Sequence, residues 1–460
     1  MADEALLAGP AIRRLRKREN LTQAAMATRL SISPSYLNLI ERNQRPVSAR
    51  VIMAMVEQFE FDPRSLREDE AVGGLDGLMR RLADERFADR AIDRDEAEEF
   101  LATSPQIAAA FARLYDKAGA GADLFDDPLA ASRREIERWR NHFADLDTAA
   151  EELADEIRLS RGDIGVALTD RLRERHQLSV RILPAEVLPN RLSRLDLHAL
   201  QIQLNEMLSP ASRNLHLATQ LAQLEQREEI DAIVQGARLE DDAARQLFAR
   251  HLTGYFAAAL IMPYGRFLRA CEATGYDLPV LQRRFGVTFE QLAHRLTTLQ
   301  RVGQRGLPFF MARLDRAGQF SKVFVGASTA RFLDGEVSCP LWAAHLAFER
   351  GGELQVQFIA LDDGGDRQGG WLTMAKRPVG RGAKGEARYS VVLGIEAVLA
   401  GDLAQARGVS LRPADAQPIG PGCARCHREN CAQRSLPPRG RHLSFDRMSR
   451  GTTPFQFGER

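Results

Sequence analysis

The stretch that most restricts the fold is residues 21–59, LTQAAMATRLSISPSYLNLIERNQRPVSARVIMAMVEQF. Thr22 is a good N-cap for a short helix, and Ser33 caps a second helix with Pro34 at its first position, where the missing N–H costs nothing. A turn at residues 43–46 separates this helix from the next. Two short helices joined by a three-residue turn and flanked by helices form the helix-turn-helix plan, whose second helix enters the major groove.

Within this second helix, predicted at about residues 34–42, Leu37 and Ile40 have the spacing of a buried face. The other positions, Glu41 among them, are expected to point to solvent. Short polar side chains at a helix N-terminus can reach base edges, and Asn38 can pair with adenine through two hydrogen bonds. The predicted DNA-binding residues, some at base edges and some at phosphates, are Gln23, Ser33, Ser35, Tyr36, Asn38, Arg42, Asn43 and Arg45.

The letters TQ and SxSYLNxIERNxRP, at this spacing, resemble the lambda-repressor-like (XRE) helix-turn-helix family over about residues 10–62. The resemblance implies binding to double-stranded operator DNA. A single module of this size binds weakly, so we expect a homo-oligomer that reads two half-sites, either a dimer or a tetramer. The alternative is a small helical domain that uses these polar residues only as caps.

Composition narrows the class of protein. The chain has 460 residues, of which 44% are hydrophobic and 27% charged, as in an ordinary globular protein of two to four domains. Residues 1–10 lack the features of a secretory signal, and no stretch of about 18 apolar residues is free of charge, so no membrane span is expected. We expect a cytoplasmic protein, in which clustered cysteines more often bind metal or do redox chemistry than form disulfides.

The spacing of the hydrophobic residues changes along the chain, and these changes divide the chain into four predicted segments. Residues 1–66 are predicted to be the DNA-binding domain, and 67–150 a helical linker or dimerisation segment in which no residue suggests chemistry. Residues 151–302 are mostly helical, with one strand expected at about 178–184. Residues 303–460 form an α+β domain, because FFMARLD, KVFVGA, LQVQFIAL and YSVVLGIEA have strand patterns. The predicted fold is multidomain, mainly α in its N-terminal two thirds.

Three of the chain's five cysteines stand in CARCHRENC, at Cys423, Cys426 and Cys431. Cys339 precedes a proline and supplies a remote fourth thiol. Three close cysteines plus one remote cysteine suit a cubane iron–sulfur cluster, while zinc takes four thiolates, usually as two pairs. A metal-free C-x-x-C redox pair would leave two thiols unused. On spacing alone, iron–sulfur and zinc both remain open.

The phrases LTGYFAAALIMPYGRF and YDLPVLQRRFGVTFEQLAHRLTTLQ resemble the ImmA/IrrE metalloprotease-like fold. In that family one helix carries HExxH and a later helix carries a third metal ligand. In this chain His216 is retained, but the catalytic Glu falls on Leu217, the second His on Gln220 and the third ligand near Leu252. A protease cannot activate water without these groups, so we expect a binding domain and no enzyme.

The order of these parts, with AAALIMPY, LDRAG and PIGPGCARCHRENCAQRSLPP, resembles the short-chain fatty acyl-CoA regulator family of transcription factors over nearly the whole chain. The resemblance implies an acyl-CoA effector, such as propionyl-CoA or acetyl-CoA, and a [4Fe-4S] cluster on Cys339, Cys423, Cys426 and Cys431. The vacated protease cleft is the expected effector pocket. Its predicted lining is basic for the CoA phosphates and aromatic for the acyl chain: Arg213, Arg266, Arg284, Arg295, Tyr255, Phe256, Phe309 and Phe310.

Two other functions fit parts of the sequence. In a primary redox sensor, oxidation of an iron–sulfur cluster would control DNA binding. In a metalloprotease that cleaves a repressor, zinc would do the chemistry, but Leu217 and Gln220 argue against that function.

Overall fold

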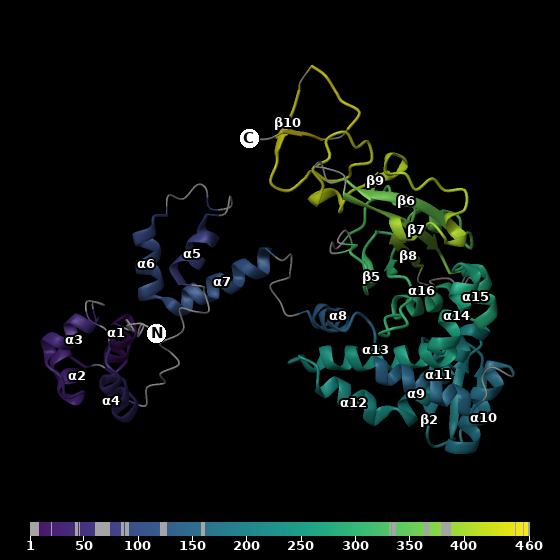
Figure 1. The fold of residues 1–460 in the computed structure, drawn as a ribbon, viewed down its shortest axis with the longest axis horizontal. Coiled ribbons are helices and arrows are strands. Elements are labelled where there is room, and N and C mark those ends of the chain that lie inside the picture. The colour runs from purple at the N-terminus through teal and green to yellow at the C-terminus, as the bar shows by residue number, and fades with distance from the viewer. Residues whose placement is uncertain are drawn as a thin grey trace. The chain divides into compact units, whose positions relative to one another are not determined.

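The computed structural model describes residues 9–19, 21–41, 45, 47–59, 74–83, 87, 92–119, 127–157, 162–330, 333, 337–362, 368–378, 388–446, 448–453 and 455–458. The chain divides into two compact units, Met1–Asp126 and Asp127–Arg460, whose elements are labelled in Figure 1. Among the described helices, none combines the length and the apolar character needed to cross a lipid bilayer.

The first unit begins with the predicted helix-turn-helix. Its helices are α1 (Gly9–Arg18), α2 (Gln23–Arg29), α3 (Pro34–Glu41) and α4 (Ala49–Phe59). The Thr22 hydroxyl accepts the N–H of Ala25, and the Ser33 hydroxyl accepts the N–H of Tyr36, so both predicted caps are confirmed. The helices enclose a small apolar core, to which each of them contributes: Ile12, Leu15, Met26, Ala27, Leu30, Leu37, Ile40, Val47, Val51, Met55 and Phe59.

Three further helices complete the first unit: α5 (Gly74–Leu82), α6 (Arg94–Thr103) and α7 (Pro105–Gly119). They share a separate core made by Leu78, Ala97, Leu101, Ala108 and Ala112. The side chain of Asp93 caps α6 by accepting the N–H of Glu96. This part of the predicted linker is therefore a folded helical module.

The second unit contains the remaining α-helices. They are α8 (Pro128–Arg138), α9 (Ala144–Glu156), α10 (Ile164–His176), α11 (Pro210–Glu225), α12 (Arg227–Gln235), α13 (Asp242–Ile261), α14 (Tyr264–Thr274), α15 (Leu278–Phe285), α16 (Phe289–Thr297) and the short α17 (Leu346–Glu349). Helix α13 is central and packs against α8, α9, α11, α12 and α16. Its Ala-rich C-terminal half is mostly buried, except at half-buried Gly254, because small side chains let neighbouring helices approach closely.

A three-stranded sheet lies among these helices, with β1 (Ser179–Leu183), β2 (Ser193–Asp196) and β3 (Gln201–Asn205) in the order β1-β3-β2. Strand β3 pairs parallel with β1 and antiparallel with β2. The single predicted strand is confirmed as β1, but the prediction missed β2 and β3. Both are short and alternate few apolar residues with polar ones, so their pattern is weak.

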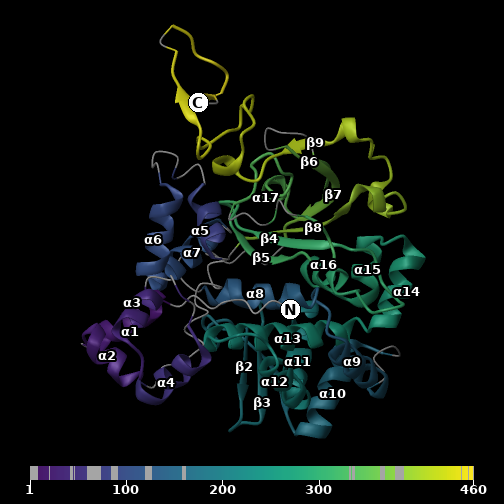
Figure 2. The ribbon, with the colours of Figure 1, turned by 60° about the vertical axis from the view of Figure 1, so that its left-hand side comes forward.

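The C-terminal part contains a six-stranded sheet in the order β5-β4-β8-β7-β6-β9. Its strands are β4 (Phe310–Leu314), β5 (Phe320–Phe324), β6 (Gln355–Leu361), β7 (Gln368–Lys376), β8 (Ser390–Glu396) and β9 (Gln417–Ile419). Neighbours are antiparallel except β6 and β9, which run parallel. Four of these strands match the predicted segments, and the two sheets lie at opposite ends of the unit with helices between them (Figure 2). The predicted fold class is confirmed.

Short elements lie between β8 and β9 and after β9. The 3-10 turns are η4 (Ala397–Leu399), η5 (Ala404–Ala406), η6 (Pro413–Asp415) and η7 (Cys423–Arg425), the last at the cysteine motif. Strands β10 (His442–Ser444) and β11 (Gln456–Gly458) pair antiparallel near the C-terminus.

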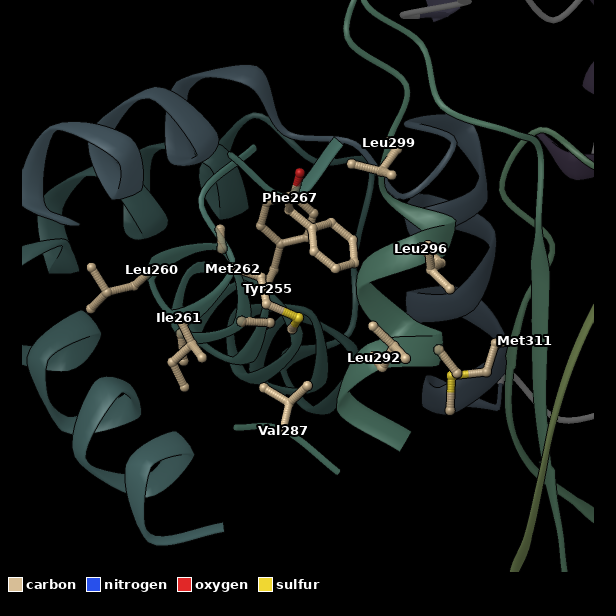
Figure 3. Close-up of a cluster of buried hydrophobic side chains, with 14 of the residues drawn as sticks. Tyr255, Leu260, Ile261, Met262, Phe267, Val287, Leu292, Leu296, Leu299 and Met311 are labelled. Atoms are coloured by element: carbon tan, nitrogen blue, oxygen red, sulfur yellow. The ribbon is translucent and has the colours of Figure 1, made fainter. Parts of the chain in front are cut away.

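The six-stranded sheet is buried on both faces. Along β4, Met311 joins the core shared with the helices, while Phe310 and Ala312 join a second core with Trp342 on the other face. This alternation is the two-residue period of a strand. Figure 3 shows Met311 beside Leu292 and Leu296 of α16, within the apolar cluster that α13, α14 and α16 build. The predicted domains 151–302 and 303–460 therefore share one continuous core.

The boundary expected at residue 150 lies earlier in the structure. Helices α8 and α9 pack against α13 and contribute Ile136, Leu146, Ala150 and Leu153 to the core of the second unit. The division between the units comes at Asp127, where α8 is about to begin. The charged, Ala-rich sequence of these helices shows only that one face is apolar, and not which domain covers that face.

A buried ion pair connects α9 to α16. The guanidinium of Arg295 donates to the carboxylate of Asp147 at 2.6 Å, and neither residue is exposed. Tyr255 donates its hydroxyl to the same carboxylate at 2.7 Å, and Arg295 also donates to the carbonyl of Met262 at 3.0 Å. Burial raises the pKa of Asp147, but the charge of Arg295 and hydrogen bonds from His142 and Tyr255 outweigh burial and leave the pKa lowered.

Replacing Asp147 by Asn should lower the free energy of unfolding by about 3–5 kcal/mol, because Arg295 then stays buried without a charged partner. Asp170→Asn is the control, since it breaks an exposed pair with Arg173 and should cost less than about 1 kcal/mol. Urea denaturation measures both. Because the folded pKa of Asp147 lies below the ordinary 3.8, wild-type stability should fall with pH below about that value. Equal stability of the two variants would contradict the role of the pair.

Candidate functional site

The predicted DNA-binding residues that the structure describes lie on α2, on and just before α3, and beyond the end of α3. Leu37 and Ile40 are fully buried, while Ser33 and Ser35 are exposed. Tyr36, Asn38 and Gln23 are half-buried, and Arg45 is exposed beyond the helix. The predicted contacts Arg42 and Asn43 lie outside the described residues. A polar surface at the start of α3 is the arrangement that base readout requires.

Glu41 does not point to solvent as predicted. It is 8% exposed, and its carboxylate accepts from Arg16 of α1 at 2.7 Å and from the Gln23 amide of α2 at 2.7 Å. The Gln23 amide also lies 3.4 Å from the Asn38 oxygen. Burial raises the pKa of Glu41, but the bonds from Arg16 and Gln23 leave it lowered. This network fixes α3 against α1 and α2, so the residues predicted to bind DNA are held in one arrangement.

A cavity of about 620 Å³ opens in the second unit between α8, α11, α13, α16, β4 and β5. A volume in this range holds much of a drug-sized or cofactor-sized molecule. Its apolar lining comes from α8, α11, α13, β4, β5 and two loop leucines: Leu129, Ile136, Leu192, Leu208, Leu215, Leu247, Gly254, Ala258, Met311, Val323 and Phe324. The cavity thus lies where the expected protease-like helices meet the C-terminal sheet.

Four basic side chains line this cavity: Arg133, Arg250, Arg313 and Lys322. Arg313 and Lys322 both contact the carboxylate of Glu290, at 3.1 and 2.8 Å. Within the described part of the chain, no carboxylate pairs with Arg133 or Arg250. An anionic ligand would therefore meet two cations that need not break an ion pair to bind it.

None of the eight residues predicted for effector binding lines this cavity. Arg295 and Tyr255 are held by Asp147, and Phe256, Phe309 and Phe310 are fully buried core residues. Arg213 bonds the carbonyl of Glu206, Arg266 faces Asp155 and Arg284 is exposed. Helix geometry separates the predicted residues of α13 from the cavity face, because successive residues point about 100° apart. On α13 the cavity face is Arg250, Gly254 and Ala258, and Tyr255 and Phe256 turn toward the core.

The remnants of the protease motif lie at one wall of the cavity. His216 lines it, and its Nδ1 lies 3.0 Å from the Ser193 hydroxyl. Leu217, at the position of the catalytic Glu, is buried, and so is Leu252. Among the described residues, no group of three His, Cys, Asp or Glu side chains is arranged to hold a single metal ion.

Two histidines that the sequence did not single out also line the cavity. The rings of His251 and His294 stand perpendicular with centroids 5.6 Å apart. Nε2 of His251 lies 2.9 Å from the Asn141 oxygen, and the Asn141 amide donates to Thr297 at 2.9 Å. Burial lowers the pKa of His251 to about 3 and that of His294 well below its usual value, so both rings are neutral near pH 7. Little in the sequence indicated that these two histidines line a cavity, because each is a single His among mainly apolar residues.

The four predicted metal ligands, Cys339, Cys423, Cys426 and Cys431, line one small cavity together. Burial raises the pKa of Cys339 and Cys426, and neighbouring thiols add to this effect. Backbone N–H groups act in the opposite direction, those of Gly420 and Leu341 at Cys339 and that of Arg428 at Cys426. The structure therefore brings together residues 339 and 423–431, as the sequence predicted.

Arg434 holds the cysteine loop from behind. It is 4% exposed and donates to the carbonyls of Cys423 and Cys426 at 3.0 and 2.8 Å, and to those of Arg428 and Leu436. Its guanidinium also lies 4.8 Å from the ring of Phe457. One buried guanidinium nitrogen, Nε, has no hydrogen-bond partner among the described residues.

The donor set at this site, four cysteines around one small cavity, has the chemistry of a thiolate-bound cluster and not the geometry of a single-ion site, for which no three described side chains are suitably placed. Four mutually repelling thiolates favour a bound cation, and the buried charge of Arg434 offsets the negative charge that a tetrathiolate centre keeps. At Gly420 an added Cβ would lie 2.7 Å from the Cys426 sulfur, so only glycine lets the backbone pass this close. The fifth cysteine, Cys271, is buried in α14 as predicted, and burial raises its pKa.

Three family models match consecutive parts of the chain: Helix-turn-helix at residues 12–66, IrrE N-terminal-like domain at 173–297, and Short-chain fatty acyl coenzyme A regulator, C-terminal, at 298–455. The chain is 33% identical to the HTH-type transcriptional regulator RamB of Mycobacterium tuberculosis over 471 residues, which cover 97% of this chain and 98% of RamB. The chain belongs to the short-chain fatty acyl-CoA regulator family.

Two other curated relatives in this family also match nearly the whole length of this chain. The HTH-type transcriptional regulator PrpR of Mycobacterium tuberculosis is 32% identical, covering 98% of this chain and 96% of PrpR. The propionyl-CoA carboxylase regulator of Cereibacter sphaeroides is 32% identical, covering 98% of each chain. A solved structure, a Mycobacterium tuberculosis transcriptional regulator, superposes with a TM-score of 0.66 at 34% identity, covering 72% of this chain and 99% of that one. This family member is thus a DNA-binding transcriptional regulator.

Replacing Arg434 by Gln should expose the cysteine loop, because the loop carbonyls lose their charged donor. In metal-stripped, reduced protein, we expect Cys426, which is 6% exposed, to be alkylated at least several-fold faster than in the wild type. Arg425→Gln is the matched control, since Arg425 lies exposed in the same loop. Mass spectrometry of the alkylated peptides measures both rates. Equal rates in the two variants would show that Arg434 does not hold the loop.

Proposed function

We propose that this regulator binds a short-chain acyl-CoA, such as propionyl-CoA or acetyl-CoA, in the cavity between α8, α13, α16 and the β4–β5 pair, and that binding changes its affinity for operator DNA. The observation that carries the proposal is the cavity lining, which combines cations with a deep apolar part. A CoA thioester has the same division, with a polyanionic nucleotide end and a small apolar acyl end. The name of the Cereibacter sphaeroides relative, propionyl-CoA carboxylase regulator, supports this ligand class.

The proposal assigns roles to the cations that line the cavity. Arg133 of α8 and Arg250 of α13 would contact the CoA phosphates, because both line the cavity and neither has a carboxylate partner among the described residues. Lys322 and Arg313 share Glu290 and would add positive potential at the β4–β5 wall. The resulting regulator acts in the cytoplasm as a dimer or tetramer, so that two recognition helices read two half-sites of operator DNA.

Coupling between the sites follows from linkage. An acyl-CoA that binds one arrangement of the oligomer more tightly shifts the population toward that arrangement. A coupling of about 1–3 kcal/mol changes operator affinity roughly 5- to 150-fold. Helix α8 supplies a physical connection, since it lines the cavity and is the first helix after the DNA-binding unit in the chain.

A second candidate function rests on the cysteine cavity. Cys339, Cys423, Cys426 and Cys431 would hold a [4Fe-4S] cluster, with zinc as the alternative metal, and such a cluster supplies one-electron redox chemistry when bound. Anaerobically purified protein should then contain about four iron atoms per chain and little zinc. If brief oxidation changes operator affinity while acyl-CoA does not, redox sensing is the function; if oxidation has no effect, the cluster is structural.

Protease activity receives no support from the described residues around His216. The position of the catalytic Glu holds buried Leu217, and that of the second His holds Gln220. The curated relatives carry the names of transcriptional regulators.

Arg133→Ala and Arg250→Ala should each weaken acyl-CoA binding about tenfold or more, because each removes a charge-assisted contact of about 1.5–3 kcal/mol. Calorimetry with propionyl-CoA, acetyl-CoA and free CoA on anaerobically purified protein measures this. Arg284→Ala is the matched control, since Arg284 is exposed and does not line the cavity. Wild-type protein that binds none of the three compounds would refute the effector assignment, and losses equal to those of the control would refute the assigned cations.

A further inference from the structure

Gly254 occupies a position where packing does not require glycine. It lies near the middle of the 20-residue helix α13. An interior helical glycine is less favourable than alanine by about 1 kcal/mol. A Cβ built at Gly254 would meet no atom within 4 Å among the described residues. Glycine therefore makes α13 less stable at this position, and no close contact with another described element requires it.

The glycine of α14 shows the contrasting case. A Cβ at Gly265 would lie 3.3 Å from the Glu151 carboxylate and 3.3 Å from the Arg269 guanidinium, so packing explains that glycine. The Gly265 N–H also donates to Glu151 at 2.7 Å. Of these two helical glycines, only Gly254 faces open space.

The open space at Gly254 is the proposed effector cavity. Arg250, Gly254 and Ala258 all line it and lie on one face of α13, one turn apart. Arg250 is exposed, Gly254 half-buried and Ala258 only 4% exposed, so the cavity deepens along the helix. At a rise of 1.5 Å per residue, Gly254 lies about 6 Å further in than Arg250.

The lining of the cavity also changes, from charged residues near Arg250 to apolar residues in the deeper part. Lys322 and Arg250 are exposed, and both carry charge. Met311 and Val323, which also line the cavity, are 0% and 4% exposed. The CoA phosphates would stay near the charged, accessible part, and the acyl group would extend along α13 past Gly254.

We propose that Gly254 determines the length of acyl chain that the cavity accepts, because its missing side chain leaves the room that the acyl group fills. The inference rests on the proposed function. A Cβ at this position would enter the cavity without colliding with any described residue, and a leucine would extend further into the same space. Substitution at this position is therefore expected to raise the stability of the protein and, at the same time, to weaken its binding of acyl-CoA molecules with longer acyl chains.

The test uses the full-length variants Gly254→Ala and Gly254→Leu, with Gly265→Ala as control. Calorimetry measures the dissociation constants of free CoA, acetyl-CoA, propionyl-CoA and butyryl-CoA, and thermal unfolding measures stability. We expect both Gly254 variants to melt about 1–4 °C higher than the wild type. Gly254→Leu should weaken butyryl-CoA binding roughly 5- to 100-fold relative to free CoA, with acetyl-CoA affected least. Gly265→Ala should lower the melting temperature and leave the order of affinities unchanged.

The outcomes separate the two proposals. Wild-type protein that binds no acyl-CoA would refute the proposed function, and this inference with it. Wild-type binding that both Gly254 variants retain with the same order among the acyl chains would overturn the inference alone. A loss that falls equally on free CoA and on every acyl-CoA would also overturn it, since the residue would then affect binding of the nucleotide end and not selection of the acyl chain.

Discussion

The ion pair between Asp147 and Arg295 is the constraint on which the second unit depends. A buried pair adds little net stability, because desolvation of both charges offsets their attraction, but removal of either partner is costly. The main effect of the pair is to fix the positions of three helices relative to one another. Arg295 also bonds Met262 at the end of α13, and Tyr255 of α13 bonds Asp147, so α9, α13 and α16 have one favoured relative position. Two of these helices border the cavity.

The same network continues into the turn between α8 and α9. Arg140 and Asn141 both have left-handed φ angles, 51° and 52°, which cost energy for residues other than glycine. Hydrogen bonds from Asn141 to Thr297 and from His251 to Asn141 compensate, and His251 lines the cavity. The cavity thus lies beside a strained turn that joins α8 to α9.

Local chemistry was predictable from the sequence, and contacts between distant segments were not. Thr22, Ser33 and Pro34 fix the ends of α2 and α3 through bonds within a few residues, so the helix-turn-helix could be predicted. The cysteine motif carries its own spacing and a fourth thiol beside a proline. Asp147 and Arg295, however, stand 148 residues apart, and nothing around Asp147 marks it as a buried partner. Tyr255 and Phe256, two of the residues predicted for effector binding, face the core and not the cavity, because the hydrophobic pattern of α13 is nearly uniform and does not fix the rotation of this helix.

The most direct test of the central proposal is the effect of ligand on DNA binding. Anaerobically purified protein first selects its operator from random duplex DNA, and fluorescence anisotropy then measures the affinity for that operator with saturating propionyl-CoA and with free CoA at fixed salt. The account predicts a change of roughly 5- to 150-fold between propionyl-CoA and free CoA. Equal affinity under both conditions, at ligand concentrations shown to fill the cavity, would contradict it.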